Sequence, residues 1–580
     1  MKRLLFALSF IAMMLQWSDS HAQKILALYN ESAEPAQVEF AQQAIKYFQS
    51  LSADNSLVFE TSSEFDNSSL YDLQKYDIII MLNEIPCSGK TRRHFEQYME
   101  KGGAWIGFHA AGSSASLSKW EWFDDFLGVE RSSSINESTK CTHPALPVKL
   151  RVEDPLHAVC RTLPDSYIAP AAEYFQWSES PRNNPDVDVL VSISPEEYPL
   201  GIGSIIPGGD TPVVWTNTKY RMIYFNFGYG LLTFSDPTQN KLITNALIWL
   251  SKNAAHRRQL INNPDPIALA YVFYRSDQHP LPDPAAITHI NFAFGHVNES
   301  CNGIFIPQES GLHAITGLKE IKPSLKVLLS IGGWGSGRFS EMVSDEALRH
   351  AFAQDCKRVI DEFNLDGIDF DWEYPTNSVA LISSAPEDTR NFTALMKEVR
   401  TAIGKDKLLT LATSASGKYI DFPAIEPFVD FVNIMTYDFV MTEPFHHAGL
   451  YPSSLTGSMS CYESVLAHVK AGFPIEKLVL GIPFYPRTVA GFPRTRGGWK
   501  AMESNPDYRV CWDDVAKAPY LRDSLGNFAA SYDNPRSIAY KCRFIHKYGM
   551  KGAMYWSYSS DDEQGTLRWA VYNGIMLKDE

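Results

Sequence analysis

The chain reads as two halves with different patterns of apolar and polar positions. Between residues 24 and 112, apolar runs of strand length alternate with segments of helical spacing. The runs KILALYN, YDIIIML and AWIGFHAAG are typical of buried strands, and AQVEFAQQAIKYFQSL and TRRHFEQYMEKGG are typical of helices. Alternation of this kind predicts an α/β domain with a doubly wound parallel sheet covered by helices.

From Ala268 onward the chain holds eight extended apolar runs, separated by helical stretches or long loops: ALAYVFY, THINFAF, KVLLSIGGW, LDGIDFDWE, LLTLATSA, DFVNIMTYD, KLVLGIPFY and GAMYWSYS. Eight is the number at which a parallel sheet closes on itself, so we predict a (β/α)8 TIM barrel over residues 267–580. Active sites of such barrels lie at the carboxyl ends of the strands. The polar residues that fall at those ends are Glu373, Asp438, Arg487 and Asp561.

Segments outside these patterns complete the predicted organisation. Lys2 and Arg3 precede an apolar run, and small residues stand before Gln23, which predicts a cleavable signal peptide over residues 1–22. We therefore expect a secreted or periplasmic protein, without an integral membrane segment after the signal is removed. The first domain is expected over 23–252 and a polar linker that ends in two prolines over 253–266. A short α+β insertion in the barrel is expected over about 491–533.

Composition and charge narrow the classes of partner and cofactor. The formal net charge is −15, so there is no basic excess to displace counterions from a nucleic acid, and a neutral or cationic ligand fits better. The eight cysteines show no C-x-x-C spacing, which leaves both disulfides and free thiols open. His143, His157, His446 and His447 lack zinc-ligand spacing, so we expect no metal and no cofactor, and we interpret these histidines as surface or loop residues.

The segment LDGIDFDWEYP carries the strongest chemical signal. Asp369, Asp371 and Glu373 alternate with apolar residues, so in a strand all three carboxylates share the face that enters the barrel. Carboxylates crowded into an apolar interior are costly and usually mark a functional site, the alternatives being a solvated acidic edge or a Ca²⁺ site. A charge at Asp371 should raise the pKa of Glu373, which could then donate a proton to a leaving oxygen, as glycoside hydrolysis requires. Carboxylates on the same strand are poorly placed as the nucleophile, so another nucleophile is needed.

This half of the chain resembles the family 18 glycoside hydrolases, the chitinase family. DGIDFDWE matches the family signature DxxDxDxE, and SIGGW, MTYD, GIPFYPR, WDDVAKAPYL, YDNPRSIAYKCRFI and GAMYWSYSSDD follow in the family's order over roughly residues 266–575. The resemblance implies a retaining, substrate-assisted reaction, in which the substrate's 2-acetamido oxygen is the nucleophile. It also implies catalytic roles for Glu373, Asp371, Asp369 and Tyr437, and substrate contacts by Trp556, Asp438, Arg487, Met435, Tyr271, Phe292 and Trp334.

Within the resemblance three functions stay open. The first is hydrolysis of β-1,4-linked N-acetylglucosamine polymers, that is, chitin and chito-oligosaccharides. The second is an endo-β-N-acetylglucosaminidase that acts on glycoprotein glycans, and the third is a non-catalytic chitin-binding lectin. Lectins on this scaffold typically lose the acid, and Glu373 is present, which favours an enzyme. The sequence leaves chain-length preference and oligomeric state open.

The first domain resembles the ThuA-like (trehalose-utilisation-like) branch of the class I glutamine amidotransferase fold, a flavodoxin-like sheet. GGAWIGFHAAG, EYFQW and PVVWTNTKYRMIYFNFGYG carry the resemblance, which covers roughly residues 24–250. An amidotransferase would have a cysteine where this chain has His109, so amidotransfer is not expected. The family's common Gly-His is Gly228-Tyr229 here, and Ala172 replaces an acidic residue. We interpret His109 as a residue held in a strained turn by hydrogen bonds, with catalysis or carbohydrate binding as alternatives.

Overall fold

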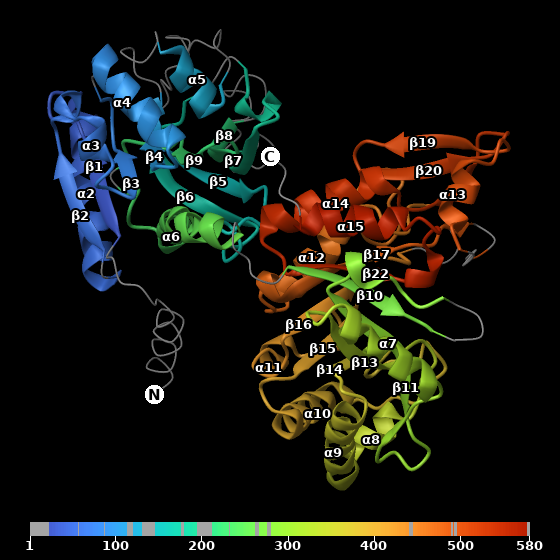
Figure 1. The fold of residues 1–580 in the computed structure, drawn as a ribbon. Coiled ribbons are helices and arrows are strands. Elements are labelled where there is room, and N and C mark those ends of the chain that lie inside the picture. The colour runs from blue at the N-terminus through green and yellow to red at the C-terminus, as the bar shows by residue number, and fades with distance from the viewer. Residues whose placement is uncertain are drawn as a thin grey trace. The chain divides into compact units, whose positions relative to one another are not determined.

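The computed structural model describes residues 23–55, 57–85, 87–112, 120–129, 146–175, 179–193, 211–230, 232–260, 266–274, 280–439, 445–488, 491 and 496–576. The chain divides into two compact units, residues 1–263 and 264–580 (Figure 1). Each unit holds one large sheet, and they are described in turn. The predicted signal peptide, residues 1–22, lies outside the described residues.

The N-terminal unit contains a nine-stranded sheet in the order β2-β1-β3-β4-β9-β8-β7-β5-β6. Its first five strands in this order pair in parallel: β2 (Val58–Ser62), β1 (Lys24–Leu28), β3 (Ile78–Met81), β4 (Ala104–Phe108) and β9 (Arg221–Phe225). The other four pair antiparallel: β8 (Thr211–Asn217), β7 (Val187–Ile193), β5 (Leu146–Val152) and β6 (Ser166–Ala172). The prediction of a doubly wound α/β sheet is confirmed, and the parallel pairing expected over residues 24–112 holds for β1 to β4. The antiparallel strands β5 to β8 extend this sheet.

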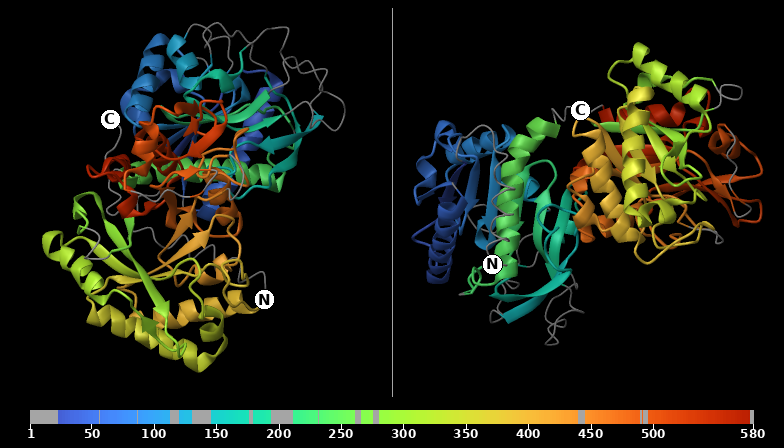
Figure 2. Two further views of the ribbon diagram at one scale, coloured as in Figure 1. Left: turned by 90° about the vertical axis from the view of Figure 1, so that its right-hand side faces the viewer. Right: turned by 90° about the horizontal axis from the view of Figure 1, so that it is seen from below.

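Helices cover both faces of this sheet, as a doubly wound domain requires (Figure 2). Helices α2 (Pro35–Asn55) and α6 (Pro237–Leu260) pack in one hydrophobic core, which includes Phe40 and Leu242. On the other face α4 (Gly89–Glu100) and α5 (Glu121–Leu127) pack in a second core, and α3 (Leu70–Leu73) is a single turn. Helix α6 continues to Leu260, through the first part of the segment expected to be a linker.

The C-terminal unit is the closed barrel that the eight apolar runs predicted. Its strands are β10 (Ile267–Val272), β11 (His289–Val297), β13 (Lys326–Gly332), β14 (Gly367–Asp371), β15 (Leu408–Ser414), β16 (Phe431–Met435), β17 (Leu478–Pro483) and β22 (Gly552–Trp556). All neighbours pair in parallel, and β10 pairs with both β11 and β22, which closes the barrel. A short strand, β12 (Ile304–Phe305), pairs antiparallel with β11.

The barrel interior and its helical layer follow from strand alternation. Side chains such as Leu269, Phe431 and Met554 fill the interior, while the alternate side chains face helices. The helices are α7 (Glu309–Ile321), α8 (Phe339–Ser344), α9 (Glu346–Glu362), α10 (Asp388–Ile403), α11 (Phe422–Ile425), α12 (Cys461–Lys470), α14 (Pro535–Tyr548) and α15 (Thr566–Met576). Reciprocal hydrogen bonds between Ser460 and Glu463 fix the start of α12, and so they also fix the residue at which the preceding loop ends.

A small antiparallel sheet with one helix interrupts the barrel between β17 and β22. Its strand order is β18-β21-β20-β19, with bounds β18 (Arg487–Thr488), β21 (Phe528–Ser531), β20 (Ala518–Arg522) and β19 (Arg509–Asp513). Helix α13 (Gly498–Glu503) precedes these last three strands in the chain. We call this the insertion sheet. Because β18 begins with Arg487, the sheet starts directly at a residue that the sequence assigned to the substrate site.

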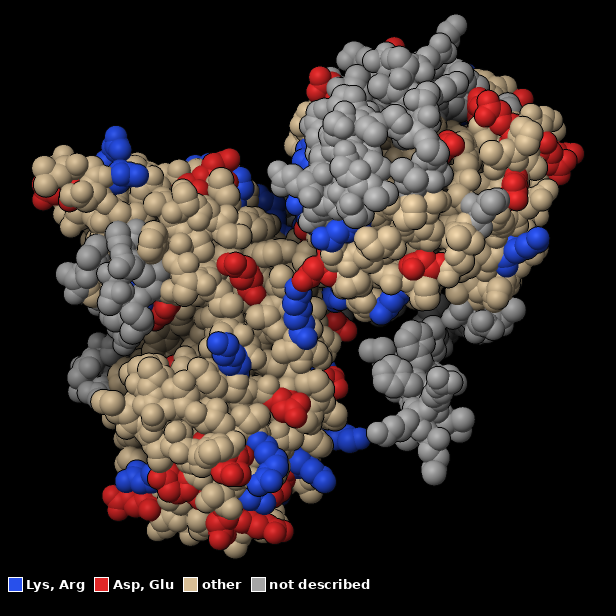
Figure 3. Space-filling model, turned by 180° about the vertical axis from the view of Figure 1, so that it is seen from behind, with Lys and Arg blue, Asp and Glu red and all other residues tan. Residues whose placement is uncertain are grey.

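Other properties of the described residues complete the picture. None of the described helices is long and apolar enough to cross a membrane. The seven described cysteines are free thiols, and Cys141 lies outside the described residues. On the face shown in Figure 3, acidic and basic side chains are interspersed among uncharged residues, so neither sign of charge forms a continuous band over the residues coloured there.

Candidate active site

The acidic strand β14 aims its carboxylates into the barrel, toward the carboxyl ends of the strands. Asp369 and Asp371 lie within the strand and are 0% and 5% exposed, and Glu373 follows its end. The apolar residues between them, Phe370 and Trp372, contact the rings of Phe392 on α10 instead. Strand alternation therefore divides this segment into a helix-facing apolar side and an acidic side, as the sequence pattern predicts.

Asp369 is the most heavily hydrogen-bonded of the three carboxylates. Its Oδ2 accepts bonds from the hydroxyls of Tyr271 and Ser330, each at 2.8 Å. Its Oδ1 accepts from the hydroxyl of Thr410 at 2.5 Å and from the amide of Asn433 at 3.3 Å. Burial raises the pKa of Asp369, while these hydrogen bonds lower it and offset part of that rise. Four strands thus converge on one carboxylate at the base of the site.

Asp371 and Glu373 form a strongly interacting pair above it. Burial raises the pKa of Asp371 well above its usual value, and the charges of Glu373 and Asp369 add to the rise. Its Oδ1 has no hydrogen-bond partner among the described residues. Burial also raises the pKa of Glu373 to about 7, although a hydrogen bond with Tyr374 lowers it, and the charge of Asp438 adds to the rise. The sequence argument gave only repulsion from Asp371 as the cause, whereas burial is the larger one.

Tyr437, Asp438 and Arg487 lie at the ends of neighbouring strands and face this pair. Burial raises the pKa of Tyr437 well above its usual value, and the charges of Asp371 and Asp438 raise it further, so its hydroxyl remains a donor. Arg487 places Nη1 2.7 Å from Oδ1 of Asp438. Burial opposes ionisation of Asp438, yet contacts with His447, Tyr485 and Arg487 hold its pKa below the usual value. The site therefore combines a neutral donor, an ionised carboxylate and a guanidinium.

Aromatic rings form a layer beside these polar groups. Trp556 lies edge-on to Tyr271, with ring centroids 5.9 Å apart, and stacks on Phe294 at 5.6 Å. Met435 packs against the core of the barrel interior together with Tyr437 and Trp556. Stacked aromatic and sulfur-containing side chains offer a flat apolar surface of the kind on which sugar rings lie.

Of two further residues assigned to substrate contacts, one faces the helices and the other stands at the surface. Phe292 is buried, and its ring lies 3.5 Å from where a Cβ added to Gly311 of α7 would stand, so it faces the helical layer and its predicted pocket contact is wrong. The register of β11 shifts between Ala293 and Gly295. This irregularity breaks the simple alternation and lets Phe294, which the sequence analysis missed, reach Trp556. Trp334, in the loop after β13, is 59% exposed and stands at the surface.

The histidines also differ from their expected environments. Three of the four histidines interpreted as surface or loop residues are buried: His157, His446 and His447. The expectation that these three lie at the surface is therefore wrong. His143 lies outside the described residues. Among the residues that the structure describes, no group of three His, Cys, Asp or Glu side chains could hold a metal ion.

His109 in the N-terminal unit has φ of 39°, which is the left-handed region that a tight turn imposes after β4. Its ring stacks on Phe175 at 3.7 Å and meets Tyr229 edge-on at 4.6 Å. Neither ring nitrogen has a hydrogen-bond partner in the described part of the chain, and burial lowers its pKa to about 3. The strained turn is confirmed, but aromatic packing holds the imidazole in place of the expected hydrogen bonds.

Comparisons with known proteins agree with the division of the chain into an N-terminal unit and a barrel unit. Chitinase A1 of Niallia circulans is 30% identical over 382 residues, which are 56% of this chain and 53% of that protein. Probable chitinase 2 of Drosophila melanogaster is 31% identical over 52% of this chain and 74% of its own length. The chain thus spans about half the length of the first of these relatives.

Two solved structures resemble the two units. A family 18 N-acetylglucosaminidase from Paenibacillus barengoltzii is 34% identical, with a TM-score of 0.49, and covers 54% of this chain and 100% of its own. A ThuA-like protein from Bacteroides uniformis is 42% identical, with a TM-score of 0.37, and covers 40% of this chain and 94% of its own.

The closed barrel and the acidic strand that rises to its mouth define the class of barrel glycoside hydrolases. Within that class the chain belongs to glycosyl hydrolases family 18, which matches residues 268–561. Residues 25–250 match a second family, described as trehalose utilisation (ThuA). An N-terminal ThuA-like domain is therefore joined to a C-terminal family 18 barrel.

Proposed function

We propose that the barrel hydrolyses β-1,4-linked N-acetylglucosamine polymers, chitin or chito-oligosaccharides, with retention of configuration. The observation that carries the proposal is the state of Glu373. Burial and the charge of Asp438 raise its pKa to about 7, so near neutral pH a large fraction of the carboxyl still holds the proton that a general acid must give. Glu373 would protonate the glycosidic oxygen and then, as a carboxylate, activate the water that completes hydrolysis.

The nucleophile in this proposal comes from the substrate. Asp371 ends β14 only two residues before Glu373 and cannot also stand on the opposite face of the sugar. The acetamido oxygen of the substrate would attack the anomeric carbon and form an oxazolinium ring. Asp371 would hold the acetamide N–H, and the hydroxyl of Tyr437 would donate to the acetamide oxygen. Trp556 would lie beneath the sugar, with Asp438 and Arg487 at its hydroxyls.

Asp371 has the properties that this role requires. Its Oδ1 has no hydrogen-bond partner within the described structure, and it is almost completely buried, so it is ready to bind a donor that the substrate brings. Asp369 would act on it from below, since the charge of Asp369 raises the pKa of Asp371 and so favours its protonated form. Phe294 joins Trp556 in the aromatic layer and replaces Phe292 in the set of expected substrate contacts.

The test is release of 4-methylumbelliferone from its chitobiose and chitotriose conjugates by the full chain. Glu373→Gln keeps the size and polarity of the side chain but removes the proton, and should lower kcat by about 10²- to 10⁴-fold without loss of thermal stability. Glu387→Gln, an exposed residue beside α10, is the matched control and should retain full activity. Cellobiose conjugates, which lack the acetamido group, should not be cleaved. Retained activity in Glu373→Gln would refute the assignment of the acid.

The same assay separates the alternatives. A glycoprotein-directed endo-β-N-acetylglucosaminidase would release glycans from a high-mannose glycoprotein and leave chitotriose conjugates intact. A lectin would bind chito-oligosaccharides with no turnover in either variant. We also propose that the mature chain is exported, on the basis of the residues before Gln23. N-terminal sequencing of the protein recovered from the producing cells should then begin near Gln23, whereas a start at Met1 would contradict export.

A further inference from the structure

His447 is a fully buried histidine directly beside the carboxylate of Asp438. It is 0% exposed, and its Nδ1 lies 3.5 Å from Oδ1 of Asp438, the same oxygen that Arg487 contacts at 2.7 Å. This distance is long for a hydrogen bond, and Nε2 has no hydrogen-bond partner among the described residues. The ring meets Tyr485 edge-on at 5.5 Å. A charged residue of the candidate active site thus lies directly beside the imidazole.

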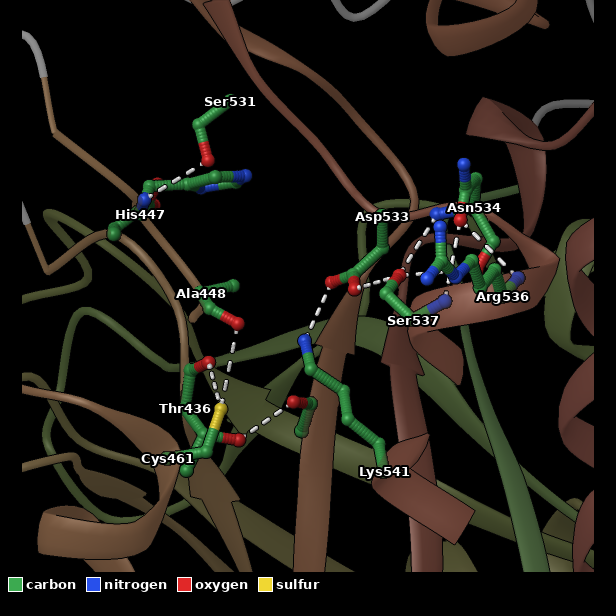
Figure 4. Close-up of polar contacts among 12 residues, drawn as sticks. Thr436, His447, Ala448, Cys461, Ser531, Asp533, Asn534, Arg536, Ser537 and Lys541 are labelled. Carbon is green, nitrogen blue, oxygen red and sulfur yellow. Dashed lines mark hydrogen bonds and ion pairs between the residues drawn. The ribbon is translucent and has the colours of Figure 1, made fainter. Parts of the chain in front are cut away.

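The backbone of His447 is held by the insertion sheet. Its N–H donates to the hydroxyl of Ser531, on β21, at 3.1 Å (Figure 4). Its carbonyl accepts from the N–H of Phe439 at 3.2 Å. The preceding residue, His446, places Nε2 3.1 Å from Oδ2 of Asp513, on β19. Two strands of the insertion sheet, β21 and β19, therefore hold the two neighbouring histidines.

Packing alone does not explain a histidine at this position. An unpartnered imidazole nitrogen in a buried site costs folding free energy, and a phenyl ring would fill a similar volume without that cost. The other partners of Asp438 are Tyr485, which follows the end of β17, and Arg487, which begins β18. His447 is the contact with Asp438 that comes from the loop held by the insertion sheet.

We propose that His447 is a positioning residue of the sugar-cleaving site, which the insertion sheet holds so that it fixes the carboxylate of Asp438 beside Glu373. This inference rests on the proposed glycosidase function. His447 touches no substrate in this scheme and acts through Asp438. The insertion sheet then contributes to the site, because the hydroxyl of Ser531 is two contacts away from a carboxylate of the site.

Several charged and titratable groups surround the contact between His447 and Asp438. Asp438 faces Arg487, His447 and Tyr485, and its charge acts on Glu373 and Tyr437. His446 next to His447 faces Asp513 and is also influenced by Asp533. Contact with His447 lowers the pKa of Asp438, and ionised Asp438 in turn raises the pKa of Glu373. Loss of the imidazole should therefore raise the pKa of Asp438 and disturb the pH dependence of catalysis.

The experiment compares three substitutions of His447 in the full chain. His447→Phe fills the site without a donor, His447→Asn places an amide N–H near the position of Nδ1, and His447→Gln places one near Nε2. For each we would measure the pH profile of kcat/KM on 4-methylumbelliferyl chitobioside between pH 4 and 9, together with the melting temperature. Ser531→Ala tests the hydrogen bond from the insertion sheet.

A matched control leaves His447 untouched. Ser453→Ala removes a hydroxyl that donates to Asp513 of the insertion sheet at 2.7 Å but does not contact His447. It should leave the shape of the pH profile unchanged, so a shift in Ser531→Ala alone would locate the effect in the contact with His447.

The expected result is a loss of kcat/KM by about 10- to 100-fold in His447→Phe at an unchanged or higher melting temperature. Its acidic limb should move to higher pH by about one unit, because Asp438 then ionises later. His447→Asn should restore most of both properties, His447→Gln should not, and Ser531→Ala should shift the limb in the same direction by less. An active wild type whose profile keeps its shape in His447→Phe would overturn the inference alone. An inactive wild type would overturn the proposed function, and this inference with it.

Discussion

Tyr271 reaches across the barrel to Asp369, since its hydroxyl, on the first strand, donates to the carboxylate on the fourth over 2.8 Å. Ser330 on β13 and Thr410 on β15 donate to the same carboxylate. These contacts connect one buried acidic residue to both neighbouring strands and to the far side of the barrel. The carboxylate at the base of the site is thus also a structural element of the barrel.

Asp369→Ala should accordingly destabilise the barrel as well as inactivate it. The substitution leaves the donors of Tyr271, Ser330 and Thr410 buried without an acceptor, which should cost about 3–5 kcal/mol of unfolding free energy. Urea unfolding measures the change. Asp361→Ala, which removes an exposed pair with Lys357, should change stability by less than about 1 kcal/mol. Equal effects of the two substitutions would show that the network around Asp369 contributes nothing.

Asp371→Asn should change how stability depends on pH. The pKa of Asp371 is raised in the folded state, so its proton stabilises the fold at low pH, and this contribution is lost as pH rises through the elevated pKa. Asparagine does not ionise. Relative to the wild type, the variant should therefore gain melting temperature between pH 4.5 and pH 8. Calorimetry at these two pH values is the measurement, and a constant difference between the proteins would contradict the raised pKa.

Lys541→Met should be strongly destabilising because it breaks a buried ion pair. Lys541 on α14 contacts Asp533 at 2.5 Å, and both side chains are 1% exposed (Figure 4). Removal of the cation leaves a buried carboxylate uncompensated, at a cost of about 3–5 kcal/mol. The double variant Asp533→Asn/Lys541→Met should recover most of that loss. Chemical denaturation compares them, and a double variant no better than Lys541→Met would argue against a charge-based effect.

His109→Phe should make the N-terminal unit less sensitive to acid. Burial lowers the pKa of His109 to about 3, so below pH 6.5 the unfolded chain takes up a proton that the folded chain does not, and stability falls. At pH 5 this amounts to about 2 kcal/mol. A phenyl ring keeps the stacking on Phe175 and does not titrate.

Thermal unfolding at pH 5 and pH 7.5 tests this prediction. His546→Phe, at an exposed histidine of the barrel unit, is the control and should leave the acid response unchanged. If His109→Phe unfolds with the same dependence on pH as the wild type, the imidazole is not held neutral in the native protein.

The barrel could be predicted because each of its strands is buried on both faces and therefore stands out as a continuous apolar run. The acidic strand could be predicted because only strict alternation places Asp369, Asp371 and Glu373 on one side. The antiparallel strands β5 to β8 were missed, since no alternation of strand and helix marks them and their pairing depends on distant partners. The position of Phe294 depends on the irregularity between Ala293 and Gly295, which no periodicity reveals.

The electrostatics of the site were only partly accessible from the sequence. Repulsion between neighbours on one strand follows from spacing, but the burial of Glu373 and the approach of Asp438 arise from residues far apart in the chain. The polar residues Thr410 and Asn433 stand within otherwise apolar strands. These two polar positions were the feature of the sequence that could have indicated the hydrogen-bond network around Asp369. Nothing near His447 in the sequence indicates that it contacts Asp438.

Contacts between residues 446–453 and the insertion sheet determine which segments of this enzyme can be exchanged with those of its relatives. His446 and Ser453 both contact Asp513, and the N–H of Leu450 donates to the carbonyl of Ala516 at 2.8 Å. A chimaera that exchanges only residues 487–531 would sever all three contacts. The insertion sheet and the loop after β16 should therefore be exchanged together, because the contacts between them make the two segments one structural unit.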